Sequence, residues 1–416
     1  MPVWELIGLV GRSIPQAFVN IDFLLITAIV LSLIYSQYHR MGVMEINLLG
    51  IPWTNPWAET LSALGYGIIG GFLASMVFIG LGIPLSETGL WYVWPLALFL
   101  MFVNPRLLCF SYAGGLLALS NLLFGWPELN VAAIMALVAV LHMVEAALIY
   151  LGGHRTPSPV YVRCKDGEVV GGLSMQKFWP LPILTLVLVA VAGEIDGANL
   201  VSMPDWWPLI KSHQSLVEGT QLVYLLFPMM AALGYGDLCL SRLPWEKARR
   251  TAISLAIYSL VLLGLAIGST HIPLLLWVVA LAAPLGHEFI VFLGRRSEHS
   301  DPPMYVSHHG AMILAVRPGS PAEAMGLMTG DIIVSINDYP VTSGREVHEV
   351  ILPWVIDPTI RIKGGMSGKG DRVVRYRGKI PPLGVVFVPE SNVERALVLQ
   401  PTGSFVRRLG PWRRPR

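Results

Sequence analysis

The sequence predicts an α-helical polytopic membrane domain of about nine spans, followed by a small β-rich α+β domain. Its 416 residues are 54% hydrophobic and only 13% charged, with a mean hydropathy of +0.60. Soluble chains carry about 25% charged residues. The charges are also uneven, because residues 1–294 hold 12 basic and 16 acidic side chains and residues 295–416 hold 17 and 11. We therefore expect the first part to face lipid and the second part to face water.

A helix needs about 20 apolar residues to cross a bilayer. Nine apolar runs reach or approach this length: Phe18–Gln37, Leu61–Gly82, Leu90–Val103, Leu107–Gly125, Val131–Gly152, Phe178–Gly193, Leu222–Leu240, Ala252–Gly268 and Ile272–Leu293. The runs Leu90–Val103 and Phe178–Gly193 are short. The third and fourth runs are separated only by the residues around Pro105, so this pair also fits a re-entrant hairpin.

The distribution of Lys and Arg predicts the orientation of these spans. With the C-terminus in the cytoplasm, the cytoplasmic loops carry twelve basic residues and the opposite side carries only Arg12 and Lys211. Cytoplasmic loops of membrane proteins are enriched in Lys and Arg. We therefore expect nine crossings of a bacterial cell membrane, with the N-terminus outside. The first apolar run lacks a basic flank and a cleavage site, so it is interpreted as an anchor that is retained.

Strand-like alternation appears in two places outside the apolar runs. Val160–Arg163 and Val169-Val170 flank a turn at Asp166-Gly167, which predicts a hairpin in the loop before residue 178. After residue 303, strands and short helices alternate. Their predicted bounds are Gly310–Val316, a helix beginning at Ser320 and Pro321, Asp331–Asn337, a helix over Ser343–Leu352, and a hairpin of Thr359–Lys363 with Arg372–Arg377. We divide the chain into a membrane domain (1–294), a linker (295–303), the small domain (304–390) and a basic tail (391–416).

The small domain resembles the PDZ family through the run RPGSPAEAMGLMTGDIIVSINDYPV. The resemblance implies a domain that binds a peptide C-terminus by strand addition beside a helix, with the carboxylate held by backbone N–H groups of a Gly-containing loop. That loop is missing before the first strand, and a Leu-Gly pair appears instead near the end of the domain. We interpret this as a circular permutation, in which the peptide-binding residues are Leu383, Gly384, Val385, Val386, Val347 and Ile351. The alternative is that Leu383–Val388 forms only a closing edge strand.

Two motifs suggest protease chemistry without completing it. Gly234-Tyr235-Gly236-Asp237 resembles the motif of intramembrane aspartyl proteases, but these need two carboxylates that share a proton, and neither Asp22 nor Asp196 is well placed. Asp237 is therefore a weak catalytic candidate, and its simpler role is a contact with the basic run Arg242–Arg250. The His287-Glu288 pair lacks the second histidine that a zinc protease needs four residues later, where the chain has Val291.

The whole arrangement resembles the MinJ-type cell-division topological determinants, which are multi-pass membrane proteins with a PDZ domain. The stretches that carry this resemblance are Asn104-Pro105-Arg106, Gln176-Lys177-Phe178-Trp179-Pro180 and Gly234-Tyr235-Gly236-Asp237. It implies a non-enzymatic scaffold whose partners are MinD-like and DivIVA-like proteins.

Three other expectations accompany this interpretation. The basic tail is either solvated or held on anionic membrane lipids. We expect no cofactor, no metal site and no nucleic-acid partner. The rival classes are an intramembrane aspartyl protease and a transporter with a regulatory PDZ domain.

Overall fold

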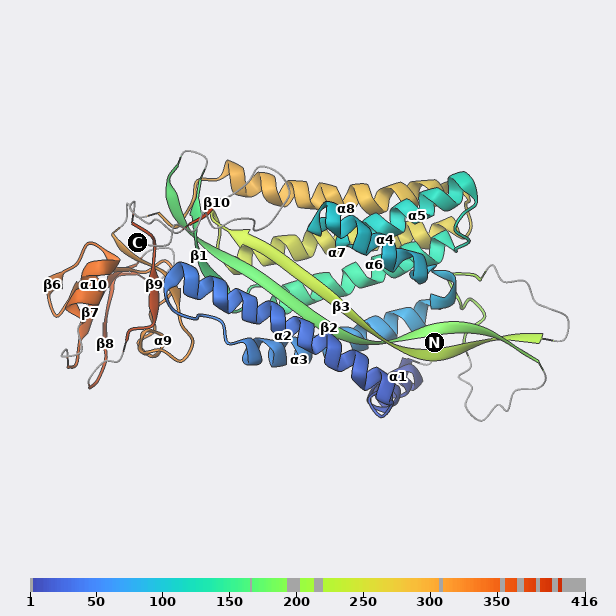
Figure 1. Ribbon diagram of the computed structural model, residues 1–416, viewed down its shortest axis with the longest axis horizontal. Helices are drawn as coiled ribbons and strands as arrows, with labels where there is room; N and C mark the ends of the chain where they lie inside the picture. The colour runs from blue at the N-terminus through green and yellow to red at the C-terminus, as the bar shows by residue number, and fades with distance from the viewer. Residues whose placement is uncertain are drawn as a thin grey trace, which may run out of the picture.

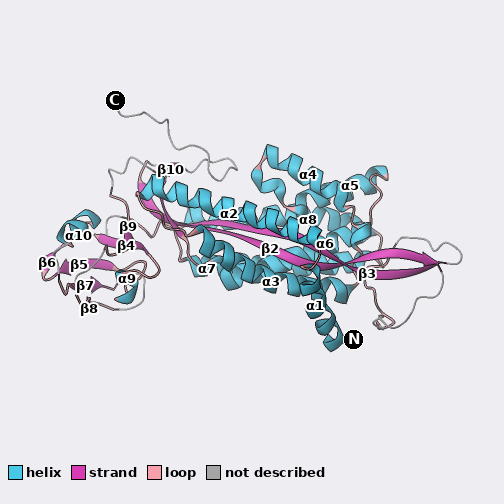
Figure 2. Cartoon of the chain, turned by 60° about the horizontal axis from the view of Figure 1, so that its bottom comes forward, coloured by secondary structure: helices cyan, strands magenta, loops and turns pink. Residues whose placement is uncertain are grey.

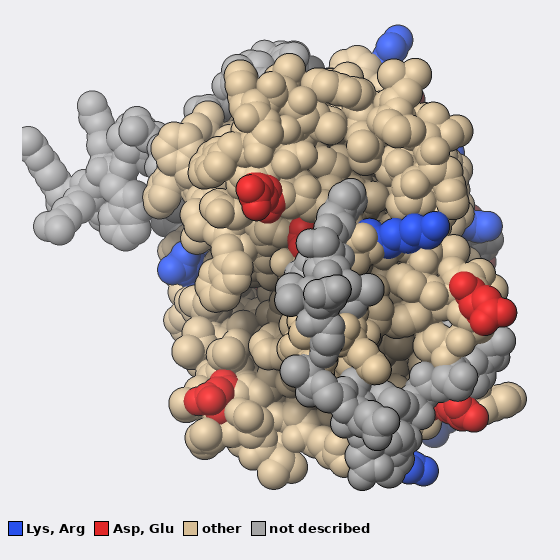
Figure 3. All heavy atoms as spheres, turned by 90° about the vertical axis from the view of Figure 1, so that its right-hand side faces the viewer, with Lys and Arg blue, Asp and Glu red and all other residues tan. Residues whose placement is uncertain are grey.

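The structure is a computed structural model that describes residues 3–164, 167–192, 203–212, 220–306, 310–351, 356–364, 370–378, 382–390 and 396–398. Long helices and a two-stranded β-ribbon run side by side along the long axis of the molecule (Figure 1). The small domain lies at one end of this bundle, which we call the PDZ end. The opposite end, seen along the axis, is mostly uncharged, with a few scattered acidic and basic side chains (Figure 3).

Helices form most of the bundle. Their bounds are α1 Val3–Ala17, α2 Ile21–Leu49, α3 Pro56–Leu81, α4 Leu90–Val103, α5 Phe110–Phe124, α6 Val131–Leu148, α7 Pro244–Ser269 and α8 Leu274–Ser300. Within the described residues, five helices are long and apolar enough to cross a membrane: α2, α3, α6 with its extension to Gly153, α7 and α8. Helix α6 is the central one, because its apolar residues are almost all buried among α3, α5, α7 and α8.

Two of the nine predicted helical spans are wrong, because they are strands. β2 (Val169–Ala192) and β3 (Thr220–Cys239) form one long antiparallel hairpin that contains the runs beginning at Phe178 and Leu222. A short apolar run has no periodicity that separates a buried strand from a buried helix. Pro180, Pro182 and Pro228 provide the physical reason, since proline inside a helix removes a hydrogen bond and clashes with the preceding turn.

The outer edge of β2 shows how a strand can be accommodated among apolar helices. Pro180 and Pro182 have no N–H group, and the N–H of Leu184 donates to Ser75 Oγ at 2.8 Å. The glycine face of α3 lies directly against this edge: a Cβ added at Gly67 would lie 1.8 Å from the oxygen of Pro180. Helix α3 therefore replaces the missing neighbouring strand by close backbone contact and by a hydroxyl acceptor.

Helices α4 and α5 form a short hairpin whose turn is the 3-10 helix Pro105–Leu108. At a rise of 1.5 Å per residue, each helix is about 21 Å long, which is less than the ~30 Å hydrocarbon core. Neither helix alone is long enough to cross. The structure thus favours the re-entrant hairpin over two further full spans.

The small domain has the elements that the sequence predicted. Its strands and helices are β4 Ala311–Val316, α9 Pro321–Ala324, β5 Ile332–Ile336, β6 Tyr339–Pro340, α10 Gly344–Val350, β7 Thr359–Lys363, β8 Arg372–Arg375 and β9 Val385–Phe387. The strand order is β8-β7-β5-β4-β9, and β6 pairs with β5. Ser320 caps α9 with Pro321 in its first turn, as predicted. The last strand of the domain therefore pairs with the first strand.

The domain is attached to the PDZ end of the bundle through several elements (Figure 2). Helix α8 continues to Ser300, so much of the predicted linker is helical.

The predicted hairpin in the loop before residue 178 is confirmed, because β1 (Ser158–Arg163) pairs with the start of β2. β10 (Leu397-Val398) adds to β1 in parallel. The basic residues of the tail at positions 407–416, for which solvation and contact with lipid were the two alternatives, lie outside the described residues.

Candidate peptide-binding site

A groove of about 370 Å³ lies between helix α10 and strand β9. The helix contributes Gly344, Arg345 and His348, and the strand side contributes residues 385–390. Three residues of the bundle complete the lining: Leu49, Ile51 and Tyr161. The groove therefore lies where the small domain meets the PDZ end of the bundle.

The loop before β9 presents two N–H groups away from the body of the domain. The oxygen of Leu383 accepts from the N–H of Ala322 at 3.1 Å, and the oxygen of Gly384 accepts from the N–H of Arg317 at 2.8 Å. In a planar trans peptide the C=O of one residue and the N–H of the next point in opposite directions. The N–H groups of Gly384 and Val385 consequently face outward, and the described residues provide no partner for them. Successive outward N–H groups of this kind bind anions.

Gly384 is required by the shape of this loop. Its φ is +76°, in the left-handed region that residues with a Cβ rarely adopt. A Cβ added there would lie 2.4 Å from Cβ of Ser320, at the start of α9. The predicted importance of a glycine at this position therefore has two physical causes, the backbone conformation and the close approach of α9.

Strand β9 has one paired edge and one edge that faces α10. The N–H of Val388 donates to the oxygen of Met312 in β4 at 3.0 Å. Since the main-chain groups of successive residues alternate in direction along a strand, those of Phe387 point to the other edge. The oxygen of Phe387 accepts a hydrogen bond from the hydroxyl of Tyr161 at 3.3 Å. A bundle side chain thus occupies one acceptor on the edge that an added peptide strand would use.

The structure brings most of the predicted site residues together. Leu383, Val385 and Val347 are buried in one apolar cluster, and Ile351 packs against it from a half-buried position. The side chain of Val386 belongs instead to the larger cluster that joins the domain to the bundle. Their proposed role in binding a peptide remains a prediction.

The groove residues missed by the sequence interpretation include His348 and Tyr161. The rings of His348 and Phe387 contact each other edge to face, with centroids 5.5 Å apart. The helical spacing from Gly344 could have indicated His348, because residues four apart share a helix face. No sequence signal could have indicated Tyr161, since it lies more than 200 residues away from β9 in the chain.

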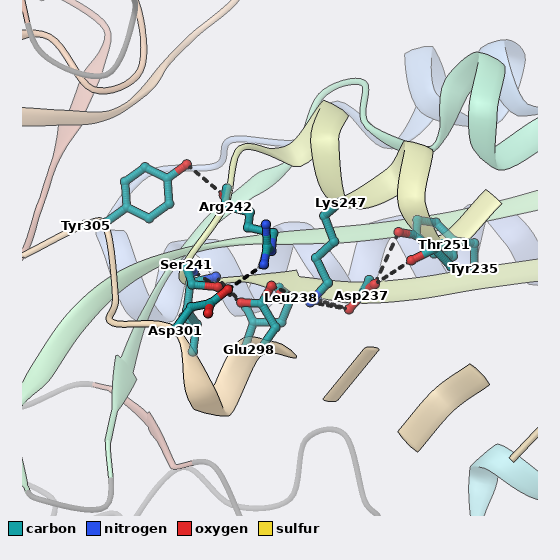
Figure 4. A network of polar contacts seen from close by, with 11 residues as sticks. Tyr235, Asp237, Leu238, Ser241, Arg242, Lys247, Thr251, Glu298, Asp301 and Tyr305 are labelled. Carbon is teal, nitrogen blue, oxygen red and sulfur yellow. Dashed lines mark hydrogen bonds and ion pairs between the residues drawn. The ribbon is translucent and has the colours of Figure 1, made fainter. Parts of the chain in front are cut away.

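Asp237 lies in a network of ion pairs and hydrogen bonds at the PDZ end (Figure 4). Its carboxylate is 2.9 Å from Nζ of Lys247, and the same Nζ is 3.0 Å from Glu298 and donates to the oxygen of Leu238 at 2.7 Å. Asp237 belongs to strand β3 and not to a helix, which corrects the expectation of a carboxylate inside a helical span. Because the ammonium group contacts both carboxylates, they do not form the proton-sharing pair of an aspartyl protease.

The geometry defines a membrane protein that presents a PDZ-type groove at one end of its bundle. Residues 312–352 match the family model of the PDZ domain. The chain is also similar to the cell division topological determinant MinJ of Bacillus subtilis (strain 168), with 27% identity over 282 residues. The match covers 65% of this chain and 64% of MinJ, which is less than two thirds of that relative's length. The resemblance that the sequence motifs predicted is confirmed by this similarity.

Proposed function

We propose that this chain is a non-enzymatic, membrane-anchored scaffold that recruits proteins by binding their C-terminal peptides in the groove between α10 and β9. The observation that carries this proposal is the outward N–H pair of Gly384 and Val385 at the start of the β9 edge that faces α10. A peptide carboxylate on this pair would leave the preceding residues of the peptide beside β9. Strand addition of this kind takes affinity from main-chain hydrogen bonds and specificity from side-chain pockets.

The order of strands supports a circularly permuted PDZ domain. The carboxylate loop and β9 come last in the chain, yet β9 pairs with β4, the first strand. The ligand-pairing strand and its loop would therefore occupy their usual place in the sheet although they are encoded after β8.

We further propose that the PDZ end faces the cytoplasm. This orientation rests on the excess of Lys and Arg in the loops on that side. A reporter that is active only in the cytoplasm should be active when it is fused after Arg296. Activity of the same reporter inserted at Glu218, with silence after Arg296, would reverse the orientation.

The similarity to MinJ supports a role in positioning cell division. MinD-like and DivIVA-like proteins are then the first partners to test, together with anionic lipid for the basic tail. The paired state of Asp237 supports a scaffold over a protease.

The central experiment is titration of the full chain, in lipid nanodiscs, with a library of peptides that have free C-termini. We expect a subset to bind, and we expect amidation of the best ligand to weaken binding tenfold or more, about 1.4 kcal/mol. A cross-linking pulldown from membranes, with and without residues 297–416, then identifies the partners. Equal binding of the free and amidated peptides would exclude the carboxylate loop as the recognition element.

A further inference from the structure

Three side chains with metal-binding atoms converge inside the bundle from three separate helices. Cys109 caps the start of α5, His142 lies on α6 and His287 lies on α8. One ligand atom of each residue lies within 4.8 Å of the other two, and Sγ of Cys109 is 3.1 Å from Nε2 of His142. The cluster lies beside the turn of the re-entrant hairpin, and His142 is buried.

The hydrogen bonds around His142 fix its tautomer. Its Nδ1 is 2.7 Å from the main-chain oxygen of Val138, which can only accept a hydrogen bond. The proton of the neutral ring therefore lies on Nδ1, and Nε2 presents a lone pair toward Cys109. Histidines that bind metals are usually oriented in this way by an acceptor at the other ring nitrogen.

The tautomer of His287 follows from a chain of donors. The hydroxyl of Tyr112 donates its single proton to Glu288 at 2.6 Å, so it can only accept from Nδ1 of His287, 3.1 Å away. Nε2 of His287 is then also unprotonated. Glu288 is held in turn by Arg106, with two contacts of 2.7 and 2.9 Å. The second imidazole is thus oriented by a network that spans the hairpin turn and α8.

A hydrogen bond from the thiol of Cys109 explains only part of this arrangement. One S–H proton can be donated to only one imidazole, so the thiol alone cannot satisfy both Nε2 lone pairs. Glu145, one turn after His142 on α6, lies within electrostatic range of all three residues, and the described residues provide no hydrogen-bond or ion-pair partner for it. A single cation at the centre of the cluster would satisfy both lone pairs, the thiolate and the nearby carboxylate.

We propose that Cys109, His142 and His287 form a binding site for a zinc-type divalent transition-metal ion within the membrane domain. Thiolate and imidazole ligands suit Zn²⁺, which prefers four tetrahedral ligands. Bond lengths of ~2.3 Å to sulfur and ~2.0 Å to nitrogen place tetrahedral ligand atoms ~3.5 Å apart. The Cys109 and His142 ligand atoms, 3.1 Å apart, would therefore separate slightly, and the other two pairs, which lie within 4.8 Å, would adjust to the same spacing. Water supplies the fourth ligand, and Glu145 contributes its negative charge from nearby.

Such an ion would link the re-entrant hairpin to α6 and α8. Sequence spacing did not reveal the site, because the three ligands come from different helices and each lacks a neighbouring ligand in the chain. The expectation of no metal rested on the wide spacing of the three cysteines and on Val291, which stands where a second histidine on the same helix would be needed. Neither observation concerns ligands that come from different helices.

The test uses the full-length protein in detergent, stripped of metal and titrated with Zn²⁺ and with Co²⁺, whose spectrum reports tetrahedral thiolate ligation. We expect one ion per chain and a sulfur-to-cobalt charge-transfer band. Cys109→Ser should abolish the band, and His142→Gln or His287→Gln should weaken binding at least tenfold. Cys164→Ser is the matched control, because it removes a cysteine outside the cluster.

A milder variant separates ligation from folding. Tyr112→Phe leaves all three ligands in place but removes the acceptor of His287 Nδ1, and it should weaken binding by about tenfold. The proposal is overturned if the wild type binds no ion, or if it binds one as tightly as the Cys109→Ser protein does.

Discussion

The hydroxyl of Tyr161, on strand β1 of the bundle, donates a hydrogen bond to the main-chain oxygen of Phe387 at 3.3 Å. This contact connects the membrane domain to the strand edge that a peptide would use. The acceptor is the same one that a main-chain N–H of an added strand would need. Peptide binding and the Tyr161 contact therefore compete, and part of the binding free energy is spent on displacing this hydroxyl.

Removing the hydroxyl should strengthen peptide binding. A neutral hydrogen bond contributes about 1 kcal/mol, so Tyr161→Phe should raise the affinity of the full chain roughly fivefold. The measurement is titration in nanodiscs with the best peptide of the library. Tyr339→Phe is the control, because Tyr339 is exposed on the small domain and does not line the groove. An unchanged or weaker affinity of Tyr161→Phe would show that the two contacts do not compete.

The conformation of Gly384 allows a strain effect to be separated from a steric one. Gly384→Ala introduces a Cβ both at a φ of +76° and 2.4 Å from Ser320. Gly326→Ala introduces one at a φ of +75° with no atom within 4 Å. Both should be destabilised by about 1–2 kcal/mol through the backbone alone. Only Gly384→Ala should also move the carboxylate loop and weaken peptide binding by tenfold or more. Thermal unfolding compares the stability of the two variants, and titration then compares their peptide affinities. Equal peptide affinities would argue against the loop.

Low pH should reduce the stability of the small domain and the peptide affinity of its groove, through protonation of His348. Burial lowers the pKa of His348, whose ring packs on the ring of Phe387. A histidine with a depressed pKa is more easily protonated in the unfolded chain, so the folded state loses stability as the pH falls from about 7 toward 5. We expect peptide affinity and thermal stability to decline together over this range. His348→Asn should flatten both profiles, whereas profiles that keep their slope would assign the effect to another group.

The small domain could be predicted from the sequence because its signals are local. Turn residues, an N-cap serine and strand alternation fix β4 to β8 without reference to the bundle. The resemblance to PDZ domains also drew attention to Gly384, where the structure has a positive φ, but the binding of a carboxylate by this loop stays a prediction. Tyr161 could not be predicted, because its role depends on how the domain is placed against β1.

The membrane domain illustrates a limit of hydropathy. Hydropathy measures how apolar a segment is and does not distinguish a helix from a strand that is covered by other elements. The prolines of β2 were visible in the sequence. A β-ribbon inside a helical bundle is nevertheless not expected from the sequence of a membrane domain, because open sheet edges are excluded from lipid. What makes the strand possible is the glycine face of α3 and the hydroxyl of Ser75, and this pairing is a tertiary feature.

The packing of α3 on β2 gives the sharpest test of this ribbon. A Cβ at Gly71 would lie 2.2 Å from the oxygen of Pro182, and both groups are held by backbone that cannot move aside as a side chain could. We expect Gly71→Ala to separate α3 from β2 and to lower the thermal stability of the detergent-solubilised protein severely, since overpacking of a tight contact costs 1–3 kcal/mol or more. Gly65→Ala is the matched control on the same helix, because its Cβ would meet no atom within 4 Å. Alanine is also the better helix former by about 1 kcal/mol, so the control should be neutral or stabilised. If Gly71→Ala were as stable as Gly65→Ala, residues 178–192 would not lie against α3 as a strand, and a helical span in that segment would have to be reconsidered.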